Sequence, residues 1–333
     1  MSLYKILIAL VFLIAAIYFF GPKPESAVYN NDFPKLPSDL SLLADSIDKS
    51  EKSRGNIKKD NEAVIVFADD SLKQKTEWSL VYLHGFSASQ MEGAPVHREF
   101  AKRYGMNLFL ARLRDHGIDT SDALLDMTSE RMWKSAKEAL AVGEKLGDKV
   151  ILMSTSTGGT LSLILAANFP EKVSALINFS PNIEINDPAA FILNDPWGLK
   201  IARLVKGSDY NVTGSETEES AKYWNNKYRL EAIVNLQELV ESSMNKKTFK
   251  KVACPTLTVA YYKDEDNQDP TVKVEAQEWM SENISTSESK KRFVKLPDVG
   301  AHPLASGIYS KDLDSVRETI NSFAEEVLEL RTK

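Results

Sequence analysis

The sequence predicts an α/β fold with a mainly parallel, doubly wound sheet that carries helices on both faces. Two observations predict it. Short aliphatic or β-branched runs recur from residue 63 onward, and segments with helical periodicity separate several of them. Because ligands of such sheets lie beyond the carboxyl ends of the strands, we expect functional residues directly after the runs. The expected strands are 63–67, 79–84, 108–111, 150–154, 175–179, 256–262 and 292–296, and the clearest helices are 129–146, 157–169 and 271–280.

The composition is that of an ordinary globular protein and argues against several functional classes. The 333 residues are 43% hydrophobic and 26% charged, so disorder is not the dominant state. A net charge of −6 without a basic stripe argues against a nucleic-acid-binding protein. The single cysteine, Cys254, excludes an intramolecular disulfide and any cysteine-based zinc or iron–sulfur site.

The amino terminus carries an apolar segment. Residues 6–20 contain no charged side chain, and Leu3 and Tyr4 extend the segment toward the ~17–20 residues that span a bilayer. We expect region 1–24 to form an uncleaved membrane-anchor helix, with the side of the membrane left open. The alternatives are a signal peptide, which would make the protein secreted or periplasmic, and a buried helix of the folded domain.

The next segment differs in composition from the rest of the chain. Residues 25–60 are polar and contain several prolines, with one short amphipathic stretch near Leu40. We expect a tether with a partly docked helix there, followed by one folded domain over 61–333.

The strongest motif lies where an expected strand meets an expected helix. The strand around 150–153 runs into Ser154-Thr155-Ser156-Thr157-Gly158-Gly159, and a long apolar helix follows. Such a turn exposes the Ser156 hydroxyl above the sheet and directs the Thr157 amide at any anion beside it. The consensus of this nucleophile elbow is G-x-S-x-G, and Ser154 occupies its first glycine position. The alternative is a serine-capped turn without chemistry.

A serine nucleophile needs a base, and four histidines are available. His97 lies on a charged helix and is interpreted as a surface residue. His84 follows a strand, and His116 lies in a loop that looks structural or placed at the rim. His302 follows the last expected strand, where a base can reach back over the sheet, so we predict that it is the general base.

The base in turn needs a carboxylate that orients it. The acidic loop after strand 256–262 offers several candidates. Asp269 directly precedes the Pro-Thr-Val that opens the next helix, and this position is better fixed than one in the middle of the loop. We therefore prefer Asp269, with Asp264 as the alternative and Asp266 third.

These pieces together resemble the α/β-hydrolase superfamily, in particular its carboxylesterase-like and monoacylglycerol-lipase-like serine hydrolases, over about residues 63–333. The chain order Ser156, Asp, His302 is that of the superfamily. His84-Gly85-Phe86 is similar to its oxyanion-loop motif. The stretch 108–117 is similar to P-x-L-x-G-H-G, with Asp115 replacing one glycine. Asp269-x-x-Val272 is similar to the D-x-x-V that follows the triad acid.

The resemblance implies an activity and a site. Ser156, His302 and Asp269 would form the triad, the backbone N–H groups of Phe86 and Thr157 would form the oxyanion hole, and no metal or organic cofactor would be needed. Esters of apolar or lipid-like acyl groups are the expected small-molecule substrates, and the amino-terminal helix would bring a membrane as partner. A serine peptidase or amidase on the same fold and a non-catalytic binding protein are the alternatives.

The resemblance also implies a helical cap over residues 181–252, inserted above the site. Its aromatic residues would either pack the fold or line an acyl pocket.

Overall fold

The computed structural model describes residues 3–213 and 217–333, and its centre is a seven-stranded sheet in the order β1-β3-β2-β4-β5-β8-β9. Only β1 is antiparallel to its neighbour, so the predicted mainly parallel sheet is confirmed. The strands are β1 (Val64–Val66), β2 (Thr76–Leu83), β3 (Asn107–Leu110), β4 (Gly147–Thr155), β5 (Ala175–Phe179), β8 (Thr256–Tyr261) and β9 (Lys291–Leu296).

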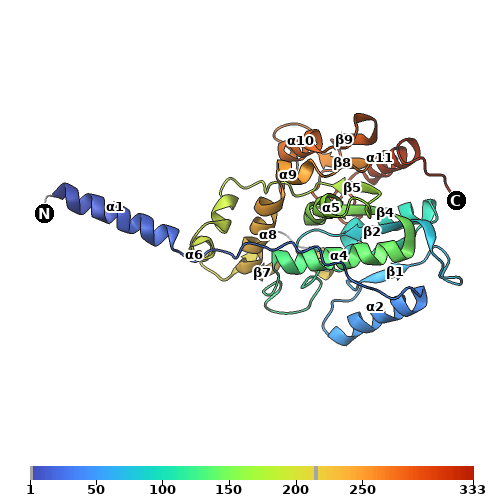
Figure 1. The fold of residues 1–333 in the computed structure, drawn as a ribbon, viewed down its shortest axis with the longest axis horizontal. Helices are drawn as coiled ribbons and strands as arrows, with labels where there is room; N and C mark the ends of the chain where they lie inside the picture. Colours follow the sequence, from blue (N-terminus) through green and yellow to red (C-terminus); the bar gives the residue numbers. More distant parts are fainter. Residues whose placement is uncertain (1–2, 214–216) are drawn as a thin grey trace.

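Helices cover both faces of this sheet, as Figure 1 shows. The alternation of β2 separates two cores: Val81 and Leu83 face one, and Leu80 and Tyr82 face the other. The helices α4 (Ser129–Leu146), α5 (Thr157–Asn168) and α10 (Val274–Asn283) contribute to the first core, and α3 (Val96–Arg103) and α11 (Leu313–Glu326) contribute to the second.

The chain between β5 and β8 forms a mainly helical insertion. Its longest helix, α8, buries Ala232 and Leu239 in the first core. The insertion contains η2 (Ala190–Asn194), α6 (Gly198–Lys206), β6 (Tyr210–Val212), α7 (Glu218–Tyr223), β7 (Lys227–Arg229), α8 (Leu230–Ser243) and α9 (Lys246–Phe249).

The amino-terminal helix α1 (Leu3–Phe19) projects from the body beside α6 (Figure 1), and none of its residues is buried. Within the described ranges, no helix combines the length and apolar character needed to cross a membrane. The predicted transmembrane anchor is therefore not supported, and the alternative of a buried helix is wrong.

The segment after α1 runs along the surface of the body. The Ala27 N–H donates to a carboxylate of α8, and the carbonyl of Asn30 accepts from the indole of Trp133 in α4. Helix α2 (Leu40–Arg54) follows and buries Leu43 in the first core.

Candidate active site

Ser156 occupies the sharp turn between β4 and α5. Its φ of 54° lies in the left-handed region, which is uncommon for a residue with a side chain and marks local strain. The backbone around it holds this conformation, because the Ser156 N–H donates to the Phe179 carbonyl at 3.0 Å and its own carbonyl accepts from the Asn182 N–H at 2.9 Å. The turn therefore has the strained backbone expected of a nucleophile elbow.

The neighbours of Ser156 explain which positions need glycine. A Cβ at Gly158 would lie 2.0 Å from the carbonyl oxygen of Leu83, so no side chain fits there. Ser154, at the first consensus glycine, does fit. Its buried hydroxyl donates to the Asn178 side chain on the adjacent strand β5 at 2.9 Å. The departure from G-x-S-x-G is thus accommodated by a partner on the next strand.

The predicted oxyanion residues lie beside this turn. Strands β2 and β4 are parallel neighbours, with Leu83 opposite Ser154, so the turn after β2 and the elbow after β4 share one edge of the sheet. A Cβ at Gly85 would lie 3.1 Å from the Cβ of Ser156. Phe86 follows Gly85, and Thr157 is the first residue of α5. That their N–H groups bind an oxyanion stays a prediction.

The structure brings His302 and Asp269 together. The Nδ1 of His302 lies 2.7 Å from Oδ2 of Asp269, whose side chain is fully buried. The other carboxylate oxygen of Asp269 accepts from the N–H groups of Thr271 and Val272, at 2.9 and 3.1 Å. An orienting carboxylate needs a fixed position and an imidazole bound through Nδ1, and Asp269 has both.

The acidic loop folds back on itself and so returns Asp269 to the strand end. Tyr262 bridges to Gln268, and the Asp269 N–H donates to the carbonyl of Tyr261, the last residue of β8. Asp264, the alternative acid, is exposed. Its Oδ1 accepts from the N–H groups of Asp266 and Asn267 in its own turn, and no hydrogen bond or ion pair joins it to His302. Of these candidates, Asp269 contacts the histidine.

The charges of the pair support each other. Burial opposes ionisation of Asp269, but the charge of His302 and the hydrogen bond from it lower the pKa of Asp269 below its usual value. Burial likewise opposes protonation of His302, and the Asp269 carboxylate more than offsets this, so the pKa of His302 lies above its usual 6.5. The pair is arranged to stabilise an imidazolium.

The other three histidines are buried and bonded to backbone groups. His84 accepts the Leu113 N–H through Nε2, at 3.0 Å, and His116 donates through Nδ1 to a carbonyl at 2.9 Å. The prediction that His97 is a surface residue is wrong, because its ring packs against Tyr82 with the centroids 4.8 Å apart. Burial lowers the pKa of His97 to about 3 and that of His116 to about 4. These histidines are neutral packing residues.

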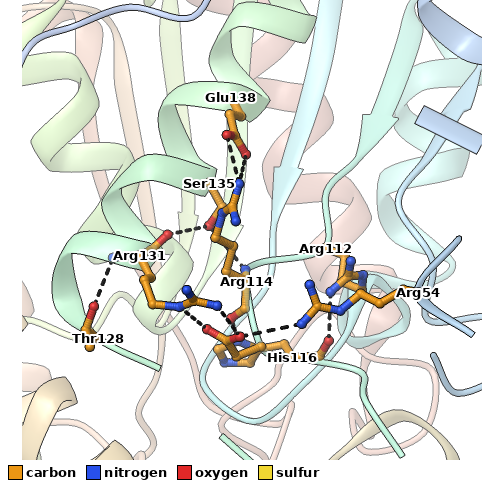
Figure 2. Close-up of polar contacts among 9 residues, drawn as sticks. Arg54, Arg112, Arg114, His116, Thr128, Arg131, Ser135 and Glu138 are labelled. Carbon is orange, nitrogen blue, oxygen red and sulfur yellow. Dashed lines mark hydrogen bonds and ion pairs between the residues drawn. The ribbon is translucent and has the colours of Figure 1, made fainter. Parts of the chain in front are cut away.

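An arginine network fixes the loop after β3, which packs against the predicted oxyanion turn, residues 84–86 after β2. Figure 2 shows Arg131 and Arg54 converging near His116. Both bind the carboxylate of Asp115, Arg131 through two hydrogen bonds of 2.7 and 2.8 Å. The His116 ring then packs against Phe86, with the ring centroids 6.1 Å apart. Asp115 has a φ of 68°, so it adopts the backbone conformation that favours glycine, and its charge is paired.

Sequence reasoning missed Glu92, which lies in the short helix η1 (Gln90–Gly93) after the predicted oxyanion turn. Its side chain is buried, and Oε2 accepts the Gly85 N–H at 2.5 Å. In the sequence, Glu92 lies eight residues after His84, and no motif distinguishes it from the other acidic residues. Among the described residues, no group of three or more His, Cys, Asp or Glu side chains is arranged to hold a metal ion.

The fold is similar to that of many solved hydrolases. A structure from work on LipS and LipT, two metagenome-derived lipolytic enzymes, has a TM-score of 0.64 at 18% identity, over 80% of this chain and 98% of that one. The monoacylglycerol lipase of Paleococcus ferrophilus has a TM-score of 0.58 at 13% identity, over 79% and 98%.

A third similar structure is Est1E from Butyrivibrio proteoclasticus with bound ferulic acid, with a TM-score of 0.53 at 20% identity, over 80% of this chain and 95% of that one. No family model and no curated protein matches the chain in sequence. These likenesses, with the mainly parallel sheet, show the α/β-hydrolase fold.

Proposed function

We propose that this chain, which has the α/β-hydrolase fold, is a serine hydrolase that cleaves carboxylic esters. Ser156 is the nucleophile, His302 the general base, and Asp269 the carboxylate that orients the imidazole. The observation that carries the proposal is the buried Asp269–His302 pair, 2.7 Å apart, in a fold whose strand-to-helix turn holds a serine at positive φ.

The reaction follows from the roles of these groups. The Ser156 Oγ attacks the acyl carbonyl, and Nε2 of His302 takes the hydroxyl proton. The N–H groups of Phe86 and Thr157 stabilise the oxyanion, a contribution of ~2.7–4 kcal/mol per donor in other enzymes. The tetrahedral intermediate collapses, and the leaving alcohol receives the proton from His302. Water then attacks the acyl-enzyme with the same proton transfers, which releases the acid and restores Ser156.

Apolar acyl groups are the proposed substrate class. Aromatic side chains of the insertion pack on two loops of the site: the ring of Tyr228 packs against Phe86 with centroids 5.0 Å apart, and Trp224 packs against Tyr309, in the loop after β9, at 5.2 Å. The Asn225 N–H also donates to the Ser87 carbonyl at 2.8 Å. Aromatic side chains beside the site favour an apolar acyl chain over a charged one. The similar structures named as lipolytic enzymes and esterases support the same class.

Covalent labelling by a fluorophosphonate probe tests the proposal. The wild-type protein should be labelled and should hydrolyse p-nitrophenyl esters of graded chain length. Ser156→Ala should lose the label and at least about 10⁴-fold in kcat/KM. Faster cleavage of aminoacyl arylamides than of esters would assign a peptidase or amidase instead, and an unlabelled wild-type protein would indicate a non-catalytic binding protein.

A further inference from the structure

Glu92 lies against the same glycine as the proposed nucleophile. Its Oε2 accepts the Gly85 N–H at 2.5 Å. A Cβ at Gly85 would lie 2.8 Å from Oε1 of Glu92 and 3.1 Å from the Cβ of Ser156. The Glu92 carboxylate and the proposed nucleophile Ser156 therefore both lie next to Gly85, the glycine of the predicted oxyanion turn.

The sequence after that turn directs Glu92 inward. Ser89 caps η1, and its carbonyl accepts the Glu92 N–H at 3.0 Å. A Cβ at Gly93 would lie 2.5 Å from the ring of Tyr82, so the backbone of η1 packs closely against this side chain of β2. Close packing of η1 on the strand leaves the Glu92 carboxylate buried, with 3% of the residue exposed.

The Gly85 N–H donates to this carboxylate. The Tyr82 hydroxyl of β2 and His302 of the loop after β9 also favour its charged form. Burial raises the pKa of Glu92 to about 7, although all three groups act to lower it. The His302 imidazole in turn interacts with two carboxylates, Asp269 and Glu92. A charge on Glu92 thus favours the protonated form of His302.

We propose that Glu92 is a positioning residue of the hydrolase, which holds the oxyanion turn through the Gly85 N–H and acts on His302 as a second carboxylate beside Asp269. This inference rests on the proposed function. The Phe86 N–H is the next amide after Gly85, so a shift of this turn displaces an oxyanion donor, and misplacement by about 1 Å can cost ~10²-fold in rate.

A direct measurement of the His302 pKa by NMR tests the electrostatic part and needs no activity. Burial lowers the pKa values of His84, His97 and His116, so His302 alone should titrate above pH 6.5. Glu92→Gln removes the charge but keeps a carbonyl that can accept the Gly85 N–H. We expect the His302 pKa to fall by about one pH unit.

Glu99→Gln is the matched control, because Glu99 is an exposed acid that pairs with Arg317. It should leave the His302 pKa unchanged. An unchanged His302 pKa in Glu92→Gln overturns the inference. The titration can also be recorded in the Ser156→Ala background, so it gives a result even if the wild-type protein proves not to be a hydrolase, an outcome that labelling reports separately.

Ester kinetics test the positioning part. Glu92→Ala removes the acceptor of the Gly85 N–H, so kcat/KM should fall by about tenfold to a hundredfold, mainly through kcat. Glu92→Gln should recover most of that loss and shift the acid limb of kcat/KM to lower pH. A Glu92→Ala enzyme within twofold of the wild type overturns the inference. If Glu92→Ala does not fold, the Glu92→Gln profile decides, and an acid limb at the wild-type pH overturns the inference.

Discussion

Ser154 shows how one side chain adapts the elbow to a non-consensus sequence. Its hydroxyl donates to Asn178 at 2.9 Å in a fully buried site. Ser154→Gly restores the consensus but leaves the Asn178 oxygen without this donor and adds a flexible residue to a strand. We expect a loss of about 1–2 kcal/mol in the free energy of unfolding with ester hydrolysis retained. Urea unfolding and the ester assay measure both, and a more stable variant would contradict this account of Ser154.

Asp269 and Asp264 form a natural pair for testing the orienting acid. The Asp269 carboxylate orients His302 and raises the His302 pKa. Asp269→Asn removes this charge, so kcat/KM should fall by up to about 10⁴-fold. Asp264→Asn should have no effect, since Asp264 binds only its own turn. Equal losses in both variants would contradict the assignment.

The pH dependence of the wild-type enzyme follows from the same pair. The base acts when His302 is neutral, and its pKa is raised above 6.5. The kcat/KM for a non-ionising ester should therefore increase with pH along a limb whose midpoint lies above 6.5. Asp269→Asn should move this midpoint down, because the carboxylate no longer stabilises the imidazolium. A wild-type midpoint below 6.5 would show that another group titrates.

At the scale of elements, local sequence patterns predicted the strands. Long-range contacts decided where one helix begins and which polar side chains are buried. Short aliphatic or β-branched runs predicted the sheet strands, and the small-residue turn after one of them predicted the serine turn at the end of β4. The helix expected at 271–280 begins instead at Val274, because the residues before it pair with the chain after β5: Val272 bridges to Ile185, and the Lys273 N–H donates to the Glu184 carbonyl. The burial of Glu92 could not be predicted, because it depends on η1 packing against Tyr82 across a turn that has no sequence pattern.

The loop after β3 gives an element-scale prediction. Asp115 is 7% exposed and depends on Arg131 and Arg54 for its charge partners, Arg131 being the closer. Arg131→Ala should therefore cost about 1–3 kcal/mol in the free energy of unfolding, since Arg131 is itself partly exposed. Adding Asp115→Gly should recover much of the loss, because glycine suits the φ of 68° and leaves no buried charge unpaired. Chemical unfolding of both variants checks this, and a double variant less stable than the single one would contradict it.

At the scale of the whole molecule, the segment after α1 connects the insertion to the α4 face of the sheet. The Ala27 N–H binds Glu238 of α8, and the buried ammonium of Lys137 in α4 donates to the carbonyls of Asn30 and Asp32. Phe33 packs on Phe169 with the ring centroids 5.1 Å apart. In contrast, α1 buries none of its residues.

Two truncations should therefore differ. Deletion of residues 1–19 should leave the melting temperature nearly unchanged. Deletion of residues 1–37 removes the acceptors of Lys137 and Trp133, and each buried donor left without a partner costs about 1–3 kcal/mol. At roughly 2–4 °C per kcal/mol in a large domain, the melting temperature should fall by several degrees or more. Equal melting temperatures for the two truncations would show that residues 20–37 add nothing to the stability of the body.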